Sequence, residues 1–473
     1  MSYEPNWDSL RTHITPKWFQ DAKFGIYTHW GVYSVPACGR NGTWYPYNMY
    51  REGTEQYRYH LKTYGALSKF GYKDFIPMFK GEKFDPDEWA ELFKKAGAQF
   101  AGPVGEHHDG FTMWDSKLTE WNAVRMGPKR DVVGELEKAI RANNMRFVIA
   151  LHHAENWWFF PHWKKELDTS DQRYAGLYGP LHNLDTEPGL EFFDQEKPSR
   201  EFLERWKGKT LEVIDKYQPD MLWFDFGLRG VQEQYKKEML AYYYNKAEEW
   251  GKEVVVTYKW NDLVPGVAVI DLELGRYGEL TYHNWLTDTS VDDQGAWSYV
   301  QDAGYKSVKK LVHNLIDNVS KNGCLLLNVG PKPNGEIPEQ AKECLLGIGK
   351  WLKVNGEAIY DTTPWMIYGE GPTQMEKSGY FSEEQEVDYT ASDIRFTIKN
   401  NVLYALCLGL PIEQVTIESL KTLYDGEIDS IEMLGSDRRL EWSLTKEGLN
   451  IKLQNEKPCE HSCVFKIMRK YPF

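Results

Sequence analysis

The sequence predicts an α/β protein, a (β/α)8-like TIM barrel followed by a C-terminal antiparallel β-sandwich. Over roughly the first 350 residues, amphipathic helices alternate with short runs that are apolar on both faces, which is typical of a parallel sheet covered by helices. Roughly seven or eight such units, without a glycine-rich nucleotide motif, favour a barrel over a doubly wound sheet. Beyond residue 360 the pattern changes to alternating apolar and polar residues. We therefore expect a barrel over residues 1–358 and a sandwich over 359–473.

Helix signals are clear in the barrel region. In the helix predicted over 85–97, Asp85 suits the N-cap, Pro86 suits the first helical position and Gly97 suits the stop. Its apolar residues recur at i, i+3, i+4 and i+7, which defines one buried stripe. Further helices are predicted over 131–144, 200–217 and 307–323.

Strands are predicted where short apolar runs follow these helices. The barrel strands are expected within 25–31, 100–111, 145–153, 221–227, 253–259, 266–273 and 324–330. In the C-terminal part, 393–409 reads as a hairpin around Asn400 and Asn401, because apolar residues alternate on both sides of this turn. Period-two runs continue over 414–420, 428–434, 440–453 and 463–470.

Composition excludes several classes of protein. The net charge is -14 and no basic cluster is present, so no nucleic-acid partner is expected. No apolar run approaches the length of a membrane span, and the N-terminus lacks the apolar core of a signal peptide, so we expect a cytoplasmic protein. The six cysteines are scattered and are expected to be reduced; Cys459 and Cys463 lack a second pair that would complete a metal site. A homo-oligomer is compatible with the sequence.

Polar side chains collect where the predicted strands end. In a barrel, chemistry takes place at the C-terminal ends of the strands, so these side chains should meet at one face. One of them, Asp225, interrupts the apolar run MLWFDFG, where a carboxylate is costly to bury unless it is paired or used. The other strand-end residues are His29, His107, His108, Asp109, His152, His153, Glu155, Asn156, Lys259 and Glu273.

Two chemistries suit such a face. Several histidines with an aspartate resemble the ligands of a metal-dependent barrel hydrolase. However, neighbouring residues of a strand point to opposite faces, so each pair His107-His108 and His152-His153 should offer only one inward ligand. The alternative is glycoside hydrolysis, in which two carboxylates flank the scissile bond while histidines and aromatic rings bind the sugar. The content of 19 tryptophans favours this second interpretation, and no metal or other cofactor is expected.

Several motifs in order resemble one known family. They are KFGIYTHWGVYSVPA, TWYPYNMY, EHHDGFTMWDS, KRDVVGEL, PDMLWFDFG and SKNGCLLLNVGPKPNGEIP, spread over residues 5–365. Together they resemble the α-L-fucosidases of glycoside hydrolase family 29. That resemblance implies a barrel with a C-terminal β-sandwich. It also implies a retaining exo-α-L-fucosidase that acts on fucosylated oligosaccharides or glycoconjugates. An inactive fucose-binding lectin stays open as a third alternative.

The resemblance also implies roles for individual residues. Asp225, in the motif Trp223-Phe224-Asp225, corresponds to the nucleophile of the family. Its charge should be stabilised by neighbours such as a histidine or Lys259. The remaining positions expected to contact substrate are His29, Trp44, Tyr45, His107, His108, His153 and Trp223.

The general acid/base is expected on a variable loop. Glu273, in the sequence DLELGR, is our choice, with Glu279 next and Asp288 or Asp293 after it. A retaining mechanism needs the acid about 5–5.5 Å from the nucleophile and protonated at the working pH. The aromatic run 157–163 is expected to shape the leaving-group side of the pocket.

Three positions depart from the family pattern. Thr43 stands where a glutamate is frequent, and Glu106 stands where many members have a lysine. Leu263 follows Asn261-Asp262 where an arginine is common, and Lys259 is the residue expected to supply that cation instead.

Overall fold

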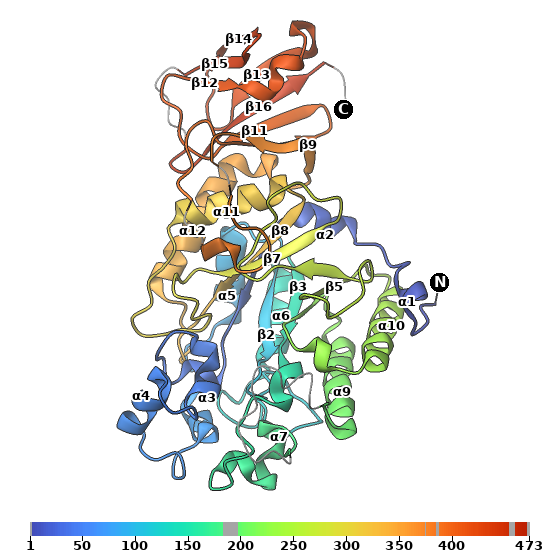
Figure 1. Cartoon of the computed structure of the whole chain (residues 1–473), viewed down its shortest axis with the longest axis vertical. Helices are drawn as coiled ribbons and strands as arrows, with labels where there is room; N and C mark the ends of the chain where they lie inside the picture. The colour runs from blue at the N-terminus through green and yellow to red at the C-terminus, as the bar shows by residue number, and fades with distance from the viewer. Residues whose placement is uncertain (1, 183–196, 374, 385–386, 454–458, 471–473) are drawn as a thin grey trace.

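The barrel predicted from the sequence is confirmed. The computed structural model describes residues 2–182, 197–373, 375–384, 387–453 and 459–470. Eight parallel strands follow one another around a closed barrel, and β1 pairs with both β2 and β8 to close it (Figure 1). The strands are β1 Phe24–Thr28, β2 Phe100–Glu106, β3 Arg146–Leu151, β4 Met221–Phe224, β5 Val255–Tyr258, β6 Val269–Asp271, β7 Trp285–Ser290 and β8 Gly323–Val329.

The barrel strands are buried on both faces, which explains their uninterrupted apolar runs. Every residue of β1, β2, β4, β5 and β8 is buried. Strand β7 is the exception that the sequence analysis missed. Its alternate residues Thr287 and Thr289 are polar although they are buried, and the segment reads as a loop for this reason.

The helices follow the expected caps. The side chain of Asp85 accepts hydrogen bonds from the main-chain N–H groups of Asp87 and Glu88, and Pro86 opens α5. Between β5 and β6, and again between β6 and β7, the chain is fully described and contains no α-helix. The helices are α1 Trp7–Leu10, α2 Lys17–Ala22, α3 Tyr45–Asn48, α4 Glu55–Thr63, α5 Pro86–Lys95, α6 Val132–Ala142, α7 Ala175–Tyr178, α9 Arg200–Tyr217, α10 Glu233–Trp250, α11 Val308–Ser320 and α12 Glu339–Asn355.

The C-terminal part is antiparallel, also as predicted. A five-stranded sheet has the order β13-β16-β11-β10-β9 and a three-stranded sheet has the order β12-β15-β14, with a separate apolar core between them (Figure 1). The strands are β9 Thr363–Glu370, β10 Ile394–Lys399, β11 Val402–Cys407, β12 Gln414–Ile417, β13 Ile428–Met433, β14 Glu441–Thr445, β15 Gly448–Lys452 and β16 Cys463–Arg469.

Buried ion pairs fix the sandwich on the barrel. Asp317 of α11 accepts from Arg395 of β10 at 2.7 Å and from Lys321 at 2.8 Å. The indole N–H of Trp351 in α12 donates to the carbonyl of Ser462 at 3.1 Å. Charges that are buried this deeply are stable only when they are paired, so the two parts are held in one arrangement.

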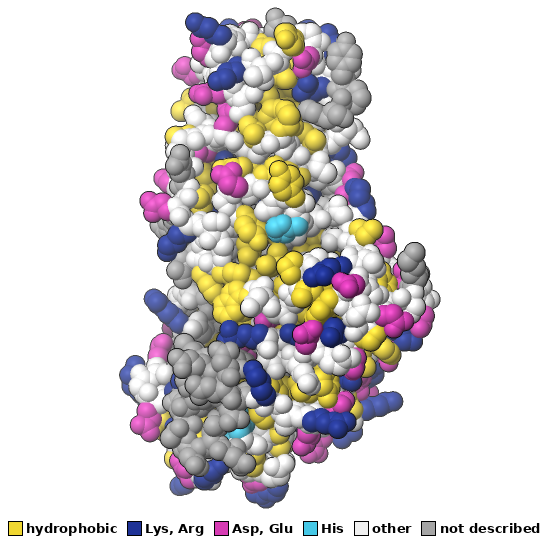
Figure 2. All heavy atoms as spheres, turned by 45° about the vertical axis from the view of Figure 1, so that its right-hand side comes forward, with side chains coloured by type: hydrophobic (Ala, Val, Ile, Leu, Met, Phe, Trp, Pro, Cys, Tyr) yellow, Lys and Arg dark blue, Asp and Glu magenta, His cyan; other side chains and the backbone are white. Residues whose placement is uncertain are grey.

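The surface carries no large field of one sign on the face seen in Figure 2, where acidic and basic side chains are interspersed. The cysteines within the described residues are all free thiols. None of the described helices combines the length and the apolarity that crossing a bilayer requires.

Candidate active site

The mouth of the barrel holds a pocket built from strand-end residues. Asp225 directly follows β4, Lys259 directly follows β5, and Glu273 lies two residues after β6. These positions place the three side chains at one face because the strands are parallel and closed into a barrel. The residues that line the pocket are Tyr27, His29, Thr43, Trp44, His107, His152, Trp223, Asp225, Glu273, Asp288 and Trp297.

Lys259 is the centre of the charges in this pocket. Its Nζ lies 3.4 Å from Oδ1 of Asp225, 2.6 Å from Oε2 of Glu273 and 3.1 Å from Oδ1 of Asp288. The ammonium is fully buried and lies over the rings of Trp223 and Phe226. Because Oδ1 of Asp225 and Oε2 of Glu273 both contact this ammonium, the two oxygens are at most about 6 Å apart. This spacing is below the separation of about 6.5–9.5 Å found in inverting glycosidases.

The two carboxyl groups have opposite protonation states near neutral pH. Burial alone would raise the pKa of Asp225, but the Lys259 ammonium and the hydrogen bond from His108 outweigh it and hold that pKa well below its ordinary value. Burial raises the pKa of Glu273, the negative charges of Asp288 and Asp225 add to this effect, and Lys259 opposes it; the net result is a pKa of about 8. Asp225 is therefore an ionised carboxylate while Glu273 holds a proton, which is the division that a nucleophile and a general acid need.

His108 links the carboxylate of Asp225 to the main chain at the end of strand β3. Its Nδ1 donates to the carbonyl of His152 at 2.9 Å, and its Nε2 lies 3.4 Å from Oδ2 of Asp225 and 3.5 Å from Glu155. Burial lowers the pKa of His108, but the charges of Glu155 and Asp225 outweigh it and raise the pKa above its ordinary value. An imidazolium can donate from both nitrogens, so this residue orients and stabilises the carboxylate.

Three other histidines form a neutral cluster beside it. His29 donates from Nδ1 to the side-chain oxygen of Asn328 at 2.8 Å, which leaves its Nε2 facing Nε2 of His152 at 3.3 Å. The ring of His107 stacks on His152. Burial lowers the pKa of His29 to about 4 and holds the pKa values of His107 and His152 well below the ordinary value. Neutral imidazoles both donate and accept, which suits sugar hydroxyls.

The expectation that each histidine pair supplies one inward side chain holds for His152-His153, where only His152 lines the pocket, but not for His107-His108. Strand β2 ends at Glu106, so His107 and His108 lie in the turn that follows, where strand alternation no longer applies, and both reach the site. One ring nitrogen each of His29, His107 and His152 lie within 4.8 Å of one another, a set that could hold a metal ion. The set takes one residue from each histidine pair together with His29, so strand alternation does not by itself exclude a metal site.

Four of the predicted contacts do not line the pocket: His108 and Lys259 contact the carboxylate of Asp225, whereas His153 and Tyr45 face other parts of the chain. His153 points away toward α9, where its Nε2 contacts the carbonyl of Trp206 at 3.1 Å, and its neighbour His152 lines the pocket instead. The hydroxyl of Tyr45 contacts Nδ1 of His60 at 3.2 Å in the packing of α3 against α4. Trp44 and Trp223 do line the pocket.

The four candidates for the general acid differ in their positions relative to the pocket. Glu273 lines the pocket beside Lys259. Asp288 also lines it, but it lies on strand β7 and accepts hydrogen bonds from Lys259 and from the hydroxyl of Tyr27. Glu279 and Asp293 are exposed, and neither lines this pocket.

The positions that depart from the family pattern have identifiable surroundings in the structure. Glu106, which precedes His107, forms a buried ion pair with Lys209 of α9 at 2.6 Å. Thr43 lines the pocket, and Lys259 supplies a cation to Asp225. Residues 157–160 of the aromatic run 157–163 are almost completely buried, and none of the run lines this pocket or the groove beside it, so its role on the leaving-group side stays a prediction.

The sequence analysis did not select His152, Tyr27 or Trp297 as site residues. His152 was recognisable as a strand-end residue, but its direction was not. Tyr27 lies inside β1, in the motif KFGIYTHWGVYSVPA but among its apolar residues, and Trp297 lies in the loop after β7, outside the quoted motifs.

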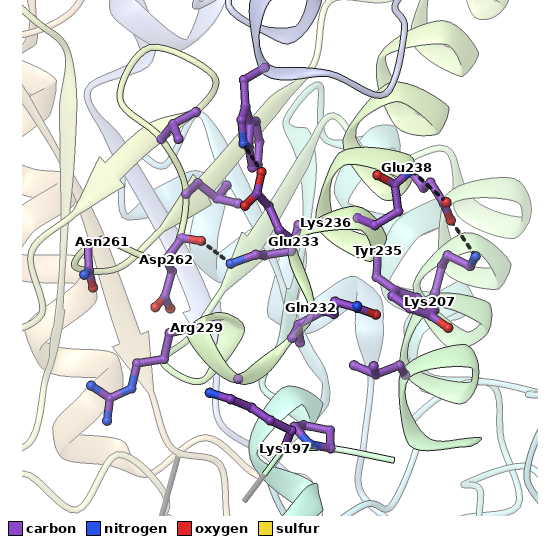
Figure 3. Close-up of a pocket in the computed structure, with 18 of the residues that line it drawn as sticks. Lys197, Lys207, Arg229, Gln232, Glu233, Tyr235, Lys236, Glu238, Asn261 and Asp262 are labelled. Atoms are coloured by element: carbon purple, nitrogen blue, oxygen red, sulfur yellow. Dashed lines mark hydrogen bonds and ion pairs between the residues drawn. The ribbon is translucent and has the colours of Figure 1, made fainter. Parts of the chain in front are cut away.

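A larger cavity, of about 1220 Å³, lies elsewhere, between α9, α10 and the loop after β5 (Figure 3). It shares no lining residue with the pocket at the barrel mouth. Its charged groups are used in packing: Lys207 pairs with Glu238 at 2.8 Å, and Lys236 donates to the carbonyl of Asp262 at 2.7 Å (Figure 3). The candidate chemistry therefore belongs to the smaller pocket.

Comparison with known sequences gives a consistent result. Family models described as "Alpha-L-fucosidase" and "Alpha-L-fucosidase C-terminal domain" match residues 1–357 and 386–468. The tissue α-L-fucosidase of Rattus norvegicus is 32% identical over 467 residues, which are 96% of this chain and 89% of that protein. The plasma α-L-fucosidase of Homo sapiens is 32% identical over 97% of this chain and 91% of that protein.

Solved structures agree with the sequence comparison. The crystal structure of the Thermotoga maritima α-fucosidase in complex with fucose has a TM-score of 0.78 and 32% sequence identity, and it covers 98% of this chain and 100% of that one. A second structure of the T. maritima enzyme, in complex with a mechanism-based inhibitor, gives a TM-score of 0.79 with the same identity and coverage.

Proposed function

The chain belongs to the α-L-fucosidase family of glycoside hydrolases, and we propose that it removes terminal α-L-fucose from fucosylated glycans with retention of configuration, by a double displacement through Asp225. The observation that carries this mechanism is the pair of carboxyl groups on Lys259. The two oxygens that contact Lys259 lie within about 6 Å of each other, and the two carboxyl groups have opposite protonation states. Retaining glycosidases place these groups about 5–5.5 Å apart.

In the first step, Asp225 attacks C1 of the fucosyl group. The glycosidic C1–O bond breaks, its electrons pass to the departing oxygen, and Glu273 gives its proton to that oxygen. The leaving group departs with this proton, and the sugar remains on Asp225 as a covalent ester. Lys259 and His108 keep Asp225 ionised before the attack, since both favour its charged form.

In the second step, Glu273 acts as the base. It takes a proton from a water molecule while the water oxygen attacks C1, and the ester bond to Asp225 breaks. Two inversions at C1 give net retention. Glu273 is then protonated again and Asp225 is ionised again, so the site returns to its starting state.

The sugar is held by the neutral histidines. We assign His29, His107 and His152 to the hydroxyls of fucose, because their rings are buried, uncharged and directed at the pocket beside Asp225. Trp223 and Trp44 form apolar walls that suit the ring face and the C6 methyl group. The 32%-identical T. maritima enzyme was crystallised with fucose and with a mechanism-based inhibitor, which supports the assignment of the sugar.

The test of this proposal follows the anomer by proton NMR during hydrolysis of 4-nitrophenyl α-L-fucoside. The expected first product is α-L-fucose, which then equilibrates with the β-anomer. Incubation with a 2-fluoro fucosyl fluoride should also add one fluorofucosyl mass to a peptide that contains Asp225. The β-anomer as first product would refute the double displacement. Saturable fucose binding without any turnover would support the inactive lectin.

Metal-dependent hydrolysis is the second candidate, because three histidine nitrogens lie within 4.8 Å of one another. The buried Lys259 ammonium argues against it, because this charge lies 3.4 Å from Asp225 at the same pocket and would repel a divalent cation. We therefore expect the same activity before and after dialysis against EDTA. Loss of activity on chelation, with recovery on adding zinc or manganese, would reverse this choice.

A further inference from the structure

One segment from beyond the barrel lies against the loop that carries Glu273. The N–H of Phe381 donates to the carbonyl of Glu273 at 2.9 Å, and the N–H of Glu383 donates to the carbonyl of Leu274 at 2.8 Å. Gly379 and Arg276 exchange two main-chain hydrogen bonds, of 2.7 and 3.2 Å. The segment 378–383, which lies between β9 and β10, thus follows the loop and is bonded to it by four main-chain hydrogen bonds.

The loop needs this support for two reasons. First, no helix follows β5 or β6 in this fully described stretch, so that side of the barrel lacks its usual cover. Second, Leu274 has a φ of 44°, in the left-handed region that a leucine rarely adopts. Such a conformation persists only where the surroundings hold it.

The segment is itself anchored to the barrel. The carboxylate of Glu383 is buried, pairs with Lys306 at 2.7 Å and accepts from the hydroxyl of Thr289 on β7 at 2.5 Å. The hydroxyl of Ser382 accepts from the N–H of Arg276 at 3.1 Å. The position of the Glu273 main chain therefore depends on residues about a hundred positions later in the chain.

The same segment forms a wall of a groove. A cavity of about 540 Å³ adjoins the catalytic pocket and shares Trp44, Glu273 and Trp297 with it. Phe381 lines this groove with 39% of its surface exposed, and its ring is backed by Phe226 at a centroid distance of 6.4 Å. Polar side chains, Asn41, Asp293 and Gln294, line the groove as well. An apolar ring face among hydrogen-bonding groups is the surface that a pyranose binds.

We propose that the segment 378–383 forms the leaving-group half of the active site: its main chain positions Glu273, and Phe381 contacts the sugar that follows fucose. The inference rests on the proposed function, in which Glu273 protonates the departing oxygen and the leaving group emerges on the Glu273 side. The leaving group that fits is a pyranose of an oligosaccharide. Phe381 is a binding residue, whereas Ser382 and Glu383 are positioning residues.

The binding role is tested with Phe381→Ala on two substrates, an α-1,2-fucosyl galactoside and α-L-fucosyl fluoride. Fluoride has no sugar to contact and departs without a proton. The ratio of kcat/KM for the disaccharide to kcat/KM for the fluoride should fall about tenfold, mainly through KM, since stacking on an aromatic ring is lost. Tyr282→Ala, which removes an exposed aromatic ring from outside the groove, is the matched control. An unchanged ratio for Phe381→Ala would overturn the binding role.

The positioning role is tested with Glu383→Gln, and with Ser382→Ala as a milder second variant if the first is poorly folded. Both should lower kcat on aryl fucosides with poor leaving groups about tenfold, should lower it much less on fucosyl fluoride, and should move the basic limb of the pH profile. A merely structural role would reduce kcat equally on every substrate and leave the limb unmoved, which would overturn the inference. Glu273→Gln serves as the reference. If that variant itself shows no dependence on the leaving group, the proposed function fails.

Discussion

The two halves of the active site are built in different ways. The half to which we assign the sugar consists of side chains at the ends of β1 to β5, such as His29, Asp225 and Lys259, each fixed by a strand of the closed barrel. The half to which we assign the leaving group consists of a loop after β6 and the segment 378–383. A strand end is held by the whole sheet, whereas a loop is held only by what packs on it. The first half is thus suited to a constant substrate group and the second to a variable one.

The strongest test of the sugar-binding half is Asp225→Asn. The amide cannot form the fucosyl ester, so kcat on 4-nitrophenyl α-L-fucoside should fall at least about 10⁴-fold while the fold is retained. In Asp225→Gly, added azide should restore turnover and give the β-configured fucosyl azide, since the small nucleophile attacks C1 from the vacated side. Activity of Asp225→Asn within about tenfold of the wild type would exclude this residue as the nucleophile.

The leaving-group half is tested by Glu273→Gln. Loss of the general acid should lower kcat on substrates with poor leaving groups by about 10²–10⁴-fold and should affect activated aryl fucosides less. The pKa of Glu273 is raised to about 8, and the catalytic form is the protonated one. Wild-type kcat/KM should therefore fall as the pH rises through about 8, and this limb should be absent from the variant. Glu279→Gln, at an exposed position on the same connection, is the matched control and should retain both activity and the limb.

Lys259→Met tests the ammonium that joins the two halves. This charge favours the ionised form of both Asp225 and Glu273, so its removal should raise both pKa values and move both limbs of the pH profile upward. We expect a loss of tenfold or more in kcat/KM near pH 7, together with a lower Tm, since breaking a buried pair costs about 3–5 kcal/mol. Lys259→Arg keeps the charge and should move the limbs much less. If both limbs of the pH profile stay at their wild-type pH values in Lys259→Met, the ammonium does not set these pKa values.

The smallest expected contrast is between two neighbours on one strand end. His152→Ala removes a group that faces the pocket and should lower kcat/KM about 5- to 150-fold, the range that corresponds to about 1–3 kcal/mol for a lost buried hydrogen bond. His153→Ala removes a group that faces α9 and should leave kcat/KM within about threefold, even if the Tm decreases. Equal losses for both variants would mean that His153 also acts in the pocket, which would contradict its position against α9.

Much of the fold could be predicted because its signals are local. The cap at Asp85, the apolar stripe of α5 and the buried strands each follow from a few neighbouring residues. Strand β7 was missed because its polar residues find their hydrogen-bond partners on other elements of the folded chain: Thr289 donates to Glu383, and Asp288 accepts from Lys259 and Tyr27.

For the site, strand-end position and motif were enough to select Asp225, Glu273, Lys259 and His29, because a parallel barrel brings its strand ends together whatever the loops do. Packing alone determined the rest. It turned His152 rather than His153 inward, placed Tyr45 in a helix contact, and brought Phe381 beside Glu273 from a segment about a hundred residues away. Side-chain direction past a strand end and contacts between distant segments depend on the whole chain being folded, so no local pattern of residues encodes them.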